Sequence, residues 1–246
     1  MSPESAPESA RQAEVGEIVN RSSIRRLRSH EIHGLTARIA RALRLSEDMR
    51  MAQGEISGGE MEPIGYETWA FPSDVVPGQT RWERRLIRVG ELFFVDEAFA
   101  SWLGTDLINE LGGNLFLIRD LTNSMFAASH LQPYTMTVIA AMLSSRHDFS
   151  KARVIDVGAG DGILSLVACR LGASLVELID IDQKSLSQAA VQLTLNGLKE
   201  NHDFTLIEAD LLKKADVGRR LIQTSKHTIL IVNIGTWPGL YTATNA

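Results

Sequence analysis

The chain has 246 residues, of which 44% are hydrophobic and 22% charged, and its formal net charge is −5 at pH 7. This length and apolar content predict a globular protein with a sizeable core. The acidic balance excludes a general attraction to nucleic acid, although a local basic patch stays open. No apolar run reaches the roughly 18 residues of a membrane span, and the N-terminus has no signal-peptide pattern, so we expect no membrane association.

One cysteine, Cys169, is present, so no disulfide can form within the chain. Because unpaired cysteines are typical of a reducing compartment, we expect a cytoplasmic protein. His30 and His33 lie in a charged segment without further cysteine or histidine at ligand spacing. We therefore expect no metal site.

The N-terminal part divides into two expected regions. Residues 1–16 are rich in serine, proline, glutamate and alanine, which predicts a disordered tail. Residues 17–80 are expected to form a helical region and a linker. Apolar residues at helical spacing, such as Leu35 and Ile39, predict a helix over residues 17–45. Its arginines form either a solvated face or a contact with RNA or an acidic protein.

The linker is predicted over residues 51–79, which are rich in glycine, proline and glutamate, with Tyr66, Trp69 and Phe71 between them. This composition favours a linker or lid with aromatic anchors rather than a domain. Residues 81–246 remain as one large expected domain.

The most informative segment is Val154–Leu166, with the sequence VIDVGAGDGILSL. Its first four residues are typical of a buried parallel strand, and the apolar residues at its end recur at helical spacing. The glycines between them permit a sharp turn and a close approach of a ligand. The segment therefore predicts a nucleotide-cofactor site formed by Asp156, Gly158, Ala159, Gly160, Asp161 and Gly162.

The spacing GxGxG differs from the GxGxxG that is usual for NAD. A dinucleotide would place its pyrophosphate at the helix N-terminus, where Asp161 would repel it. S-adenosylmethionine has no phosphate, and its sulfonium is positive, so acidic residues are compatible with it. We therefore predict S-adenosylmethionine as the cofactor.

The next predicted strand, Leu175–Asp182, ends in acidic residues. Asp180 lies 22 residues after Gly158, the spacing of a ribose-binding carboxylate, and Ile181 is expected beside it at the cofactor. Asp182 precedes a helical run that ends at Asn196-Gly197, so it is expected to cap that helix.

Two further strands are predicted to end in polar residues. Phe204–Asp210 delivers Asp210, followed by Leu211, toward the adenine, and Thr228–Gly235 contains Asn233 near its end. Asp210 could instead be a solvated loop carboxylate. Ligands of open α/β sheets bind at the carboxyl ends of the strands, so the polar residues there should converge. The predicted fold is therefore a doubly wound, mostly parallel α/β sheet with a helical N-terminal appendage.

These motifs resemble the class I S-adenosylmethionine-dependent methyltransferases, and within them the PrmA-type ribosomal protein lysine methyltransferases. The resemblance starts at Trp82 with LIRVGELFFVD, continues through NLFLIRDLTNSMFAASHLQPYTM, and covers the chain to its C-terminus. It implies that residues 81–246 are a Rossmann-like methyltransferase domain. Within it, residues 126–135 stand where the family has an FGTGxHxTT segment, although the glycine-bearing part is replaced by Ala127, Ala128 and Ser129.

The resemblance also implies roles for individual residues. Phe126 and Thr135 are expected to close over the cofactor, and His130 is expected to be either a substrate contact or a structural histidine. Asn233 is implied as the catalytic residue that holds an acceptor amine beside the methyl group. Trp237 and Tyr241 either line the acceptor channel or pack as ordinary aromatic residues.

The family's sheet has seven strands, whereas few residues follow the strand that ends near Gly235. We expect a C-terminally incomplete sheet, with two alternatives: residues 86–120 contribute strands, or a partner supplies the missing edge. An exposed edge strand would also favour a homo-oligomer.

Three functions are compatible with these patterns. Methyl transfer to a protein amine, on a lysine side chain or a terminus, is the function that the resemblance implies. A methyltransferase for a small molecule or RNA is the second. A catalytically silent S-adenosylmethionine-binding module is the third.

Overall fold

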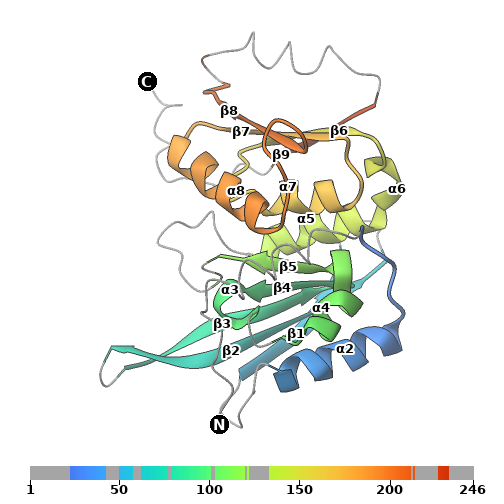
Figure 1. Cartoon of the computed structure of the whole chain (residues 1–246), viewed down its shortest axis with the longest axis vertical. Helices are drawn as coiled ribbons and strands as arrows, with labels where there is room; N and C mark the ends of the chain where they lie inside the picture. The colour runs from blue at the N-terminus through green and yellow to red at the C-terminus, as the bar shows by residue number, and fades with distance from the viewer. Residues whose placement is uncertain are drawn as a thin grey trace, which may run out of the picture.

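A computed structural model describes residues 23–42, 50–57, 62–76, 79–100, 103–119, 121, 133–211, 213 and 227–232. These residues form two sheets, one with strand order β1-β2-β3-β4-β5 and one with strand order β8-β7-β6-β9. Three helices, α5, α7 and α8, lie between the two sheets (Figure 1). The described helices include none that is long and apolar enough to cross a membrane.

The five-stranded sheet comes from the first half of the chain. Its strands are β1 (Arg50–Ile56), β2 (Ile64–Val76), β3 (Gln79–Val89), β4 (Leu92–Asp96) and β5 (Leu115–Ile118). The first four strands pair antiparallel, and β5 joins β4 in parallel. The connections hold α3 (Glu97–Ala100), α4 (Thr105–Leu111) and the 3-10 turn η1 (Gly112–Asn114).

Strands β4 and β5 are buried on both faces, so they are apolar on both sides. Phe94 and Phe116, stacked with ring centroids 5.0 Å apart, face the core shared with α5 and α7. Phe93 and Leu115 face the opposite core, which includes residues of α2 and α4. A sheet buried on both faces loses the polar and apolar alternation that usually reveals a strand.

The expectation of a linker or lid over residues 51–79 is wrong, because β1, β2 and the start of β3 occupy this stretch. Trp69 is buried in the core with α2, and Tyr66 packs against the core on the other face. Glu67, which suggested a solvated linker, accepts a hydrogen bond from Arg88 Nε at 2.8 Å across the β2–β3 pair. The aromatic anchors are therefore strand residues with opposite orientations.

The far end of the β2–β3 hairpin extends beyond the rest of its sheet (Figure 1). Strand β1 pairs with β2 only over residues 64–70, and β4 pairs with β3 only over residues 86–89. Residues 71–76 and 79–84 therefore form a two-stranded ribbon without a third strand among the described residues.

The N-terminal helix is shorter than predicted within the described residues. Helix α2 runs over Ser29–Ala42, and the expected Leu35 and Ile39 are buried. Residues 23–28 are described but not helical. The helix begins where Glu31 accepts a hydrogen bond from Arg28 N at 2.8 Å, as in half of a capping box. Upstream, Arg25 N donates to Asn114 Oδ1 at 3.1 Å, which holds this segment extended.

The four-stranded sheet is parallel throughout and confirms the expected Rossmann-like α/β class. Its strands are β6 (Arg153–Val157), β7 (Leu175–Asp180), β8 (Phe204–Glu208) and β9 (Thr228–Val232). The helices are α5 (Pro133–Ser144), α6 (Arg146–Phe149), α7 (Ile163–Arg170) and α8 (Gln183–Leu195). The predicted strand, turn and helix of the glycine segment are thus confirmed.

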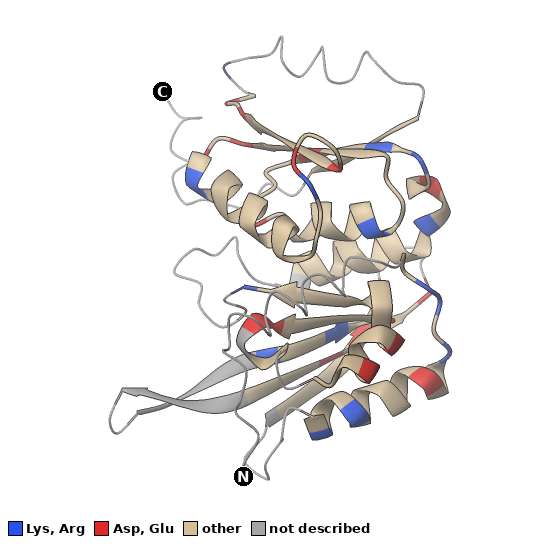
Figure 2. Ribbon diagram, in the orientation of Figure 1, with Lys and Arg blue, Asp and Glu red and all other residues tan. Residues whose placement is uncertain are grey.

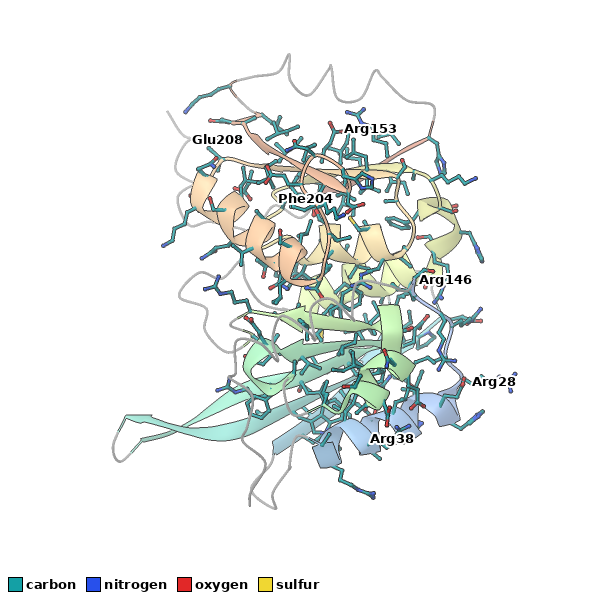
Figure 3. The ribbon with its side chains drawn as sticks, in the orientation of Figure 1. Arg28, Arg38, Arg146, Arg153, Phe204 and Glu208 are labelled. Atoms are coloured by element: carbon teal, nitrogen blue, oxygen red, sulfur yellow. The ribbon has the colours of Figure 1, made fainter. Side chains whose placement is uncertain are left out.

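Polar contacts join the two sheets in addition to the shared core. Arg146, on α6, forms an ion pair with Glu91, which lies in the turn between β3 and β4. Figure 3 shows Arg146 at the level where the two halves meet. Phe204, fully buried on β8, belongs to the same core as Phe94 and Phe116 of the other sheet.

Residues 86–120 do not complete the parallel sheet, so that alternative is wrong. Their strands, β3, β4 and β5, belong to the separate five-stranded sheet. The domain limits themselves stay a prediction. The expected boundary before residue 81 falls inside β3, which pairs with β2. Residues 1–16, expected to form a disordered tail, lie outside the described residues.

Candidate functional site

The glycine turn joins β6 to α7 in the middle of the parallel sheet. Gly158, Gly160 and Gly162 have φ angles of 73°, 56° and 78°, in the left-handed region that glycine adopts without strain. Gly158 N and Ala159 N both donate to Ile179 O, at 2.8 and 3.2 Å, which ties the turn to the end of β7. The turn is therefore fixed beside the neighbouring strand end.

Gly162 is required by packing as well as by its φ angle. A Cβ atom at this position would lie 2.7 Å from Leu193 Cδ1, 3.0 Å from Ala189 Cβ and 3.2 Å from Leu178 Cδ2. Two of these neighbours belong to α8 and the third to β7. The third glycine thus serves the close approach of the turn to α8 rather than the ligand.

Asp156 is fully buried at the carboxyl end of β6, with an exposure of 0%. Its Oδ2 accepts a hydrogen bond from Ser165 Oγ at 2.7 Å, whereas Oδ1 has no hydrogen-bond partner in the structure. Burial raises the pKa of this carboxyl group to about 6, and the Ser165 hydrogen bond opposes that rise. Asp156 is therefore a buried acid with one oxygen available.

Asp161 lies at the start of α7. Its Oδ1 accepts a hydrogen bond from Ile163 N at 3.3 Å. Burial raises the pKa of its carboxyl group to about 7, and the nearby charge of Asp156 adds to that rise. The carboxylate thus occupies a helix N-terminus that could otherwise receive a phosphate.

Asp180 ends β7 and faces the glycine turn. Its two carboxylate oxygens accept from Gly160 N at 3.0 Å and from Asp182 N at 2.9 Å. The next residue, Ile181, has 65% of its surface exposed, which is unusual for a large apolar side chain. A charged acceptor and an uncovered apolar surface therefore lie together at this strand end.

The ends of β7 and β8 are adjacent in the sheet. Asp180 pairs with Glu208, and Ala209 N donates to Asp180 O at 3.0 Å. Asp210 follows, with Lys213 Nζ 3.2 Å from its Oδ2, and Leu211 is half-buried next to it. Figure 2 shows acidic residues at this end of the sheet. Asp156, Asp161, Asp180 and Asp210 therefore lie along one edge, as expected for strand-end residues.

Asp182 has the capping role that was expected of it. Its side chain accepts from Lys184 N at 3.1 Å and from Ser185 N at 3.2 Å. The hydrogen bond from the Ser185 hydroxyl, 2.7 Å away, lowers the pKa of the carboxyl group most. Helix α8 ends at Leu195 with Asn196 as its C-cap, and Gly197 follows with a φ angle of 78°, which confirms the C-cap pair.

Several predicted site residues lie outside the described residues: Phe126, His130, Asn233, Trp237 and Tyr241. Thr135 is described, in the first turn of α5, with 6% exposure. No group of three metal-ligating side chains occurs in the described parts of the chain. Ser165, which donates to Asp156, was not predicted as a site residue, although a serine inside the apolar run ILSLVACR is a signal for a buried polar contact.

The parallel sheet, the glycine turn and the acidic strand ends together define a Rossmann-like α/β fold of the kind that binds a nucleotide cofactor. Residues 134–234 match the family model described as ribosomal protein L11 methyltransferase (PrmA). The resemblance to the PrmA-type family is confirmed over this region.

Two curated relatives extend the similarity beyond this region. A protein named ribosomal protein L11 methyltransferase from Fusobacterium nucleatum subsp. nucleatum is 32% identical over 177 residues, which cover 71% of this chain and 51% of that protein. One of the same name from Geobacillus thermodenitrificans is 27% identical over 171 residues, 69% of this chain and 47% of that protein. The chain thus spans about half the length of these two relatives.

Two solved structures overlap with the chain more loosely. A ribosomal protein L11 methylase from Lactobacillus delbrueckii subsp. bulgaricus is 24% identical with a TM-score of 0.39, covering 54% of this chain and 61% of that one. A SAM-dependent methyltransferase from Agrobacterium tumefaciens is 15% identical with a TM-score of 0.40, covering 76% and 60%. Overlap at this level carries no argument about function.

Replacing Gly162 by alanine should destabilise the protein. The left-handed φ angle alone costs a non-glycine residue about 1–3 kcal/mol, and the contact with Leu193 adds to this. Urea unfolding followed by circular dichroism measures the change. The control is Gly104→Ala, because nothing lies within 4 Å of a Cβ at Gly104. Equal stability of the two variants would contradict the packing role of Gly162.

The raised carboxyl pKa values predict a pH-dependent stability. The folded state keeps protons on Asp156 and Asp161 up to pH of about 6 and 7, whereas the unfolded state releases them near 3.8. These groups therefore make the free energy of unfolding fall as pH rises from about 4 to 7.

In the Asp161→Asn variant, the free energy of unfolding should fall less steeply with rising pH than in the natural sequence, because one of the two groups no longer titrates. Urea unfolding at several pH values measures it. Asp182→Asn is the control, since the carboxyl pKa of Asp182 is lowered and its stabilisation is lost only below this window. The same slope for Asp161→Asn and the natural sequence would show that the carboxyl pKa of Asp161 is not raised.

Proposed function

We propose that this chain is an S-adenosylmethionine-dependent methyltransferase that transfers a methyl group to a protein amine, on a lysine or a chain terminus. The observation that carries the proposal is the acidic edge around a glycine turn, in a region that matches the PrmA family model. The two curated relatives described above, which share that name, support a protein as the acceptor.

The charge of the crevice favours this cofactor over a dinucleotide. Asp161 already accepts the hydrogen bond of Ile163 N at the start of α7. A pyrophosphate there would meet a carboxylate instead of free N–H groups. A sulfonium cation with an amine at its methionine end suits a crevice that contains Asp156 and Asp161.

The strand ends suit the adenosine part. Asp180 keeps lone pairs for ribose hydroxyl groups in addition to its two backbone bonds, since an ionised carboxylate has about four acceptor sites. Exposed Ile181 offers an apolar surface for the adenine ring, and Asp210 can accept a hydrogen bond from the adenine amino group. When bound, the cofactor supplies a methyl group, and the electrons of its carbon–sulfur bond stay with sulfur.

The protein's share of the reaction is mainly positioning, because a direct displacement requires little acid or base chemistry. The acceptor amine must arrive without its extra proton, so that its lone pair can form the new bond to carbon. Asn233, implied by resemblance and outside the described residues, is proposed to hold that amine. His130, Trp237 and Tyr241 are proposed as substrate contacts, and Phe126 and Thr135 as residues that close over the cofactor.

The cytoplasm is the proposed location, and a homo-oligomer through a sheet edge remains part of the proposal. The alternatives are a small-molecule or RNA methyltransferase and a silent binding module. All three share the cofactor. The two enzymes differ in the acceptor, whereas the silent module transfers no methyl group.

Asp180→Ala should weaken S-adenosylmethionine binding about ten- to a hundredfold. The loss corresponds to one or two charge-assisted hydrogen bonds of about 1.5–3 kcal/mol in total. Isothermal titration calorimetry measures the affinity. Asp106→Ala, at an exposed position on α4, is the control and should bind like the natural sequence. An unchanged affinity in Asp180→Ala would remove the ribose assignment.

The acceptor is tested with S-adenosylmethionine that carries a radioactive methyl group. Incubation with ribosomal proteins, ribosomal RNA or a small-molecule extract should label the protein fraction, in amine-linked form. Label in the RNA or small-molecule fraction would replace the protein acceptor by the second function. Tight cofactor binding without any transfer would support the silent module.

A further inference from the structure

Strand β5 has no strand on its outer side in the described sheet, yet its edge is not open. Leu117 and Arg119 are two residues apart, so their backbone N–H groups point to the same side of the strand, away from β4. Leu117 N donates to Asn196 Oδ1 at 2.9 Å, and Arg119 N donates to Gln192 Oε1 at 2.9 Å. Leu117 O accepts from Asn196 Nδ2 at 2.7 Å and also from Gln192 Nε2. Two side-chain amides thus form the hydrogen bonds that a neighbouring strand would form at this edge.

Both amides come from the end of α8, one helical turn apart. Gln192 is 4% exposed and Asn196 is 0% exposed, which is rare for these residue types. Asn196 also accepts at its backbone oxygen from Arg170 Nη2 at 2.9 Å, and the Arg170 guanidinium lies 5.9 Å from the Phe116 ring centroid. We call the pair Gln192 and Asn196 the amide clamp.

The amide clamp is connected to the candidate cofactor site through the same helix. Helix α8 starts after Asp182, whose backbone N–H bonds to Asp180. Leu193 lies next to Gln192 in the sequence, and it is the residue against which Gly162 packs most closely. The position of α8 therefore determines where the end of β7 at Asp180 and the glycine turn lie. The amide clamp fixes the position of α8 relative to β5.

We propose that Gln192 and Asn196 are positioning residues for the cofactor crevice. They hold α8 against β5, so the five-stranded sheet determines how closely α8 supports the turn. This inference rests on the proposed cofactor function and adds that the five-stranded sheet is part of the binding apparatus. Neither residue touches the cofactor.

The first test uses the natural sequence alone. Coupling between two sites is reciprocal, so a cofactor that needs the clamped geometry must also stabilise the clamp. Saturating S-adenosylmethionine should slow hydrogen exchange of the Leu117 and Arg119 amides by about fivefold or more. Exchange that is unchanged, under conditions where calorimetry shows binding, would overturn the positioning role and leave the cofactor function intact.

The second test uses Gln192→Glu and Asn196→Asp. Each keeps the side-chain shape and an acceptor oxygen but replaces the amide that donates to Leu117 O by a carboxyl group. The control is Gln188→Glu, the same substitution one turn earlier on the exposed side of α8. Affinity is measured by calorimetry at 25 °C, with circular dichroism to verify that each variant is folded.

Clamp variants should exchange the Leu117 and Arg119 amides faster and bind S-adenosylmethionine about five- to fiftyfold more weakly, whereas Gln188→Glu should change neither. Faster exchange with unchanged affinity would overturn the inference, since the clamp would then be merely structural. If the natural sequence binds no S-adenosylmethionine at all, the proposed function fails, and the inference fails with it. The exchange experiment on the natural sequence decides the question even if both clamp variants fail to fold.

Discussion

The close contact between the glycine turn and helix α8 is the constraint on which the rest of the site depends. Gly162 leaves no room for a side chain against Leu193 and Ala189, so the turn, α8 and β7 can approach only in this arrangement. That approach brings Gly160 N within 3.0 Å of the Asp180 carboxylate and sets the two strand ends side by side. The acidic edge is therefore a result of backbone packing.

At this edge, burial and a nearby cation would shift the carboxyl pKa values in opposite directions. Asp156 and Asp161 lie where desolvation favours their neutral forms, whereas a nearby cation would favour their ionised forms. Asp182, two residues after Asp180, is exposed and hydrogen-bonded to Ser185, and its carboxyl pKa is lowered. The chain thus places acids of similar chemistry in different environments around the carboxyl ends of two neighbouring strands, β6 and β7. Their separate tasks as buried acid and helix cap follow from those environments.

The sequence predicted the structure correctly where a residue type has one main structural role. The glycine turn, the two strands that begin at Leu175 and Phe204 and the Asp182 cap follow from short patterns, although both strands end two residues earlier than predicted, at Asp180 and Glu208. The pattern was misleading over residues 51–79, because β1 is a mostly exposed edge strand of the described sheet and Glu67, on β2, is paired with a residue of the next strand. The amide clamp was not predictable, since Gln192 and Asn196 meet β5 across about 75 residues of chain. Such contacts depend on how two sheets meet, which no local pattern encodes.

The overhanging part of the β2–β3 hairpin has a consequence of a different kind. Residues 71–76 and 79–84 bond only to each other among the described strands, so adding or removing a residue pair there shifts no other register. A one-residue change of length in β4 or β5 would instead exchange the faces of a strand that is buried on both sides. The ribbon is therefore the place in this half of the molecule where insertions and deletions can accumulate during evolution without disturbing the core.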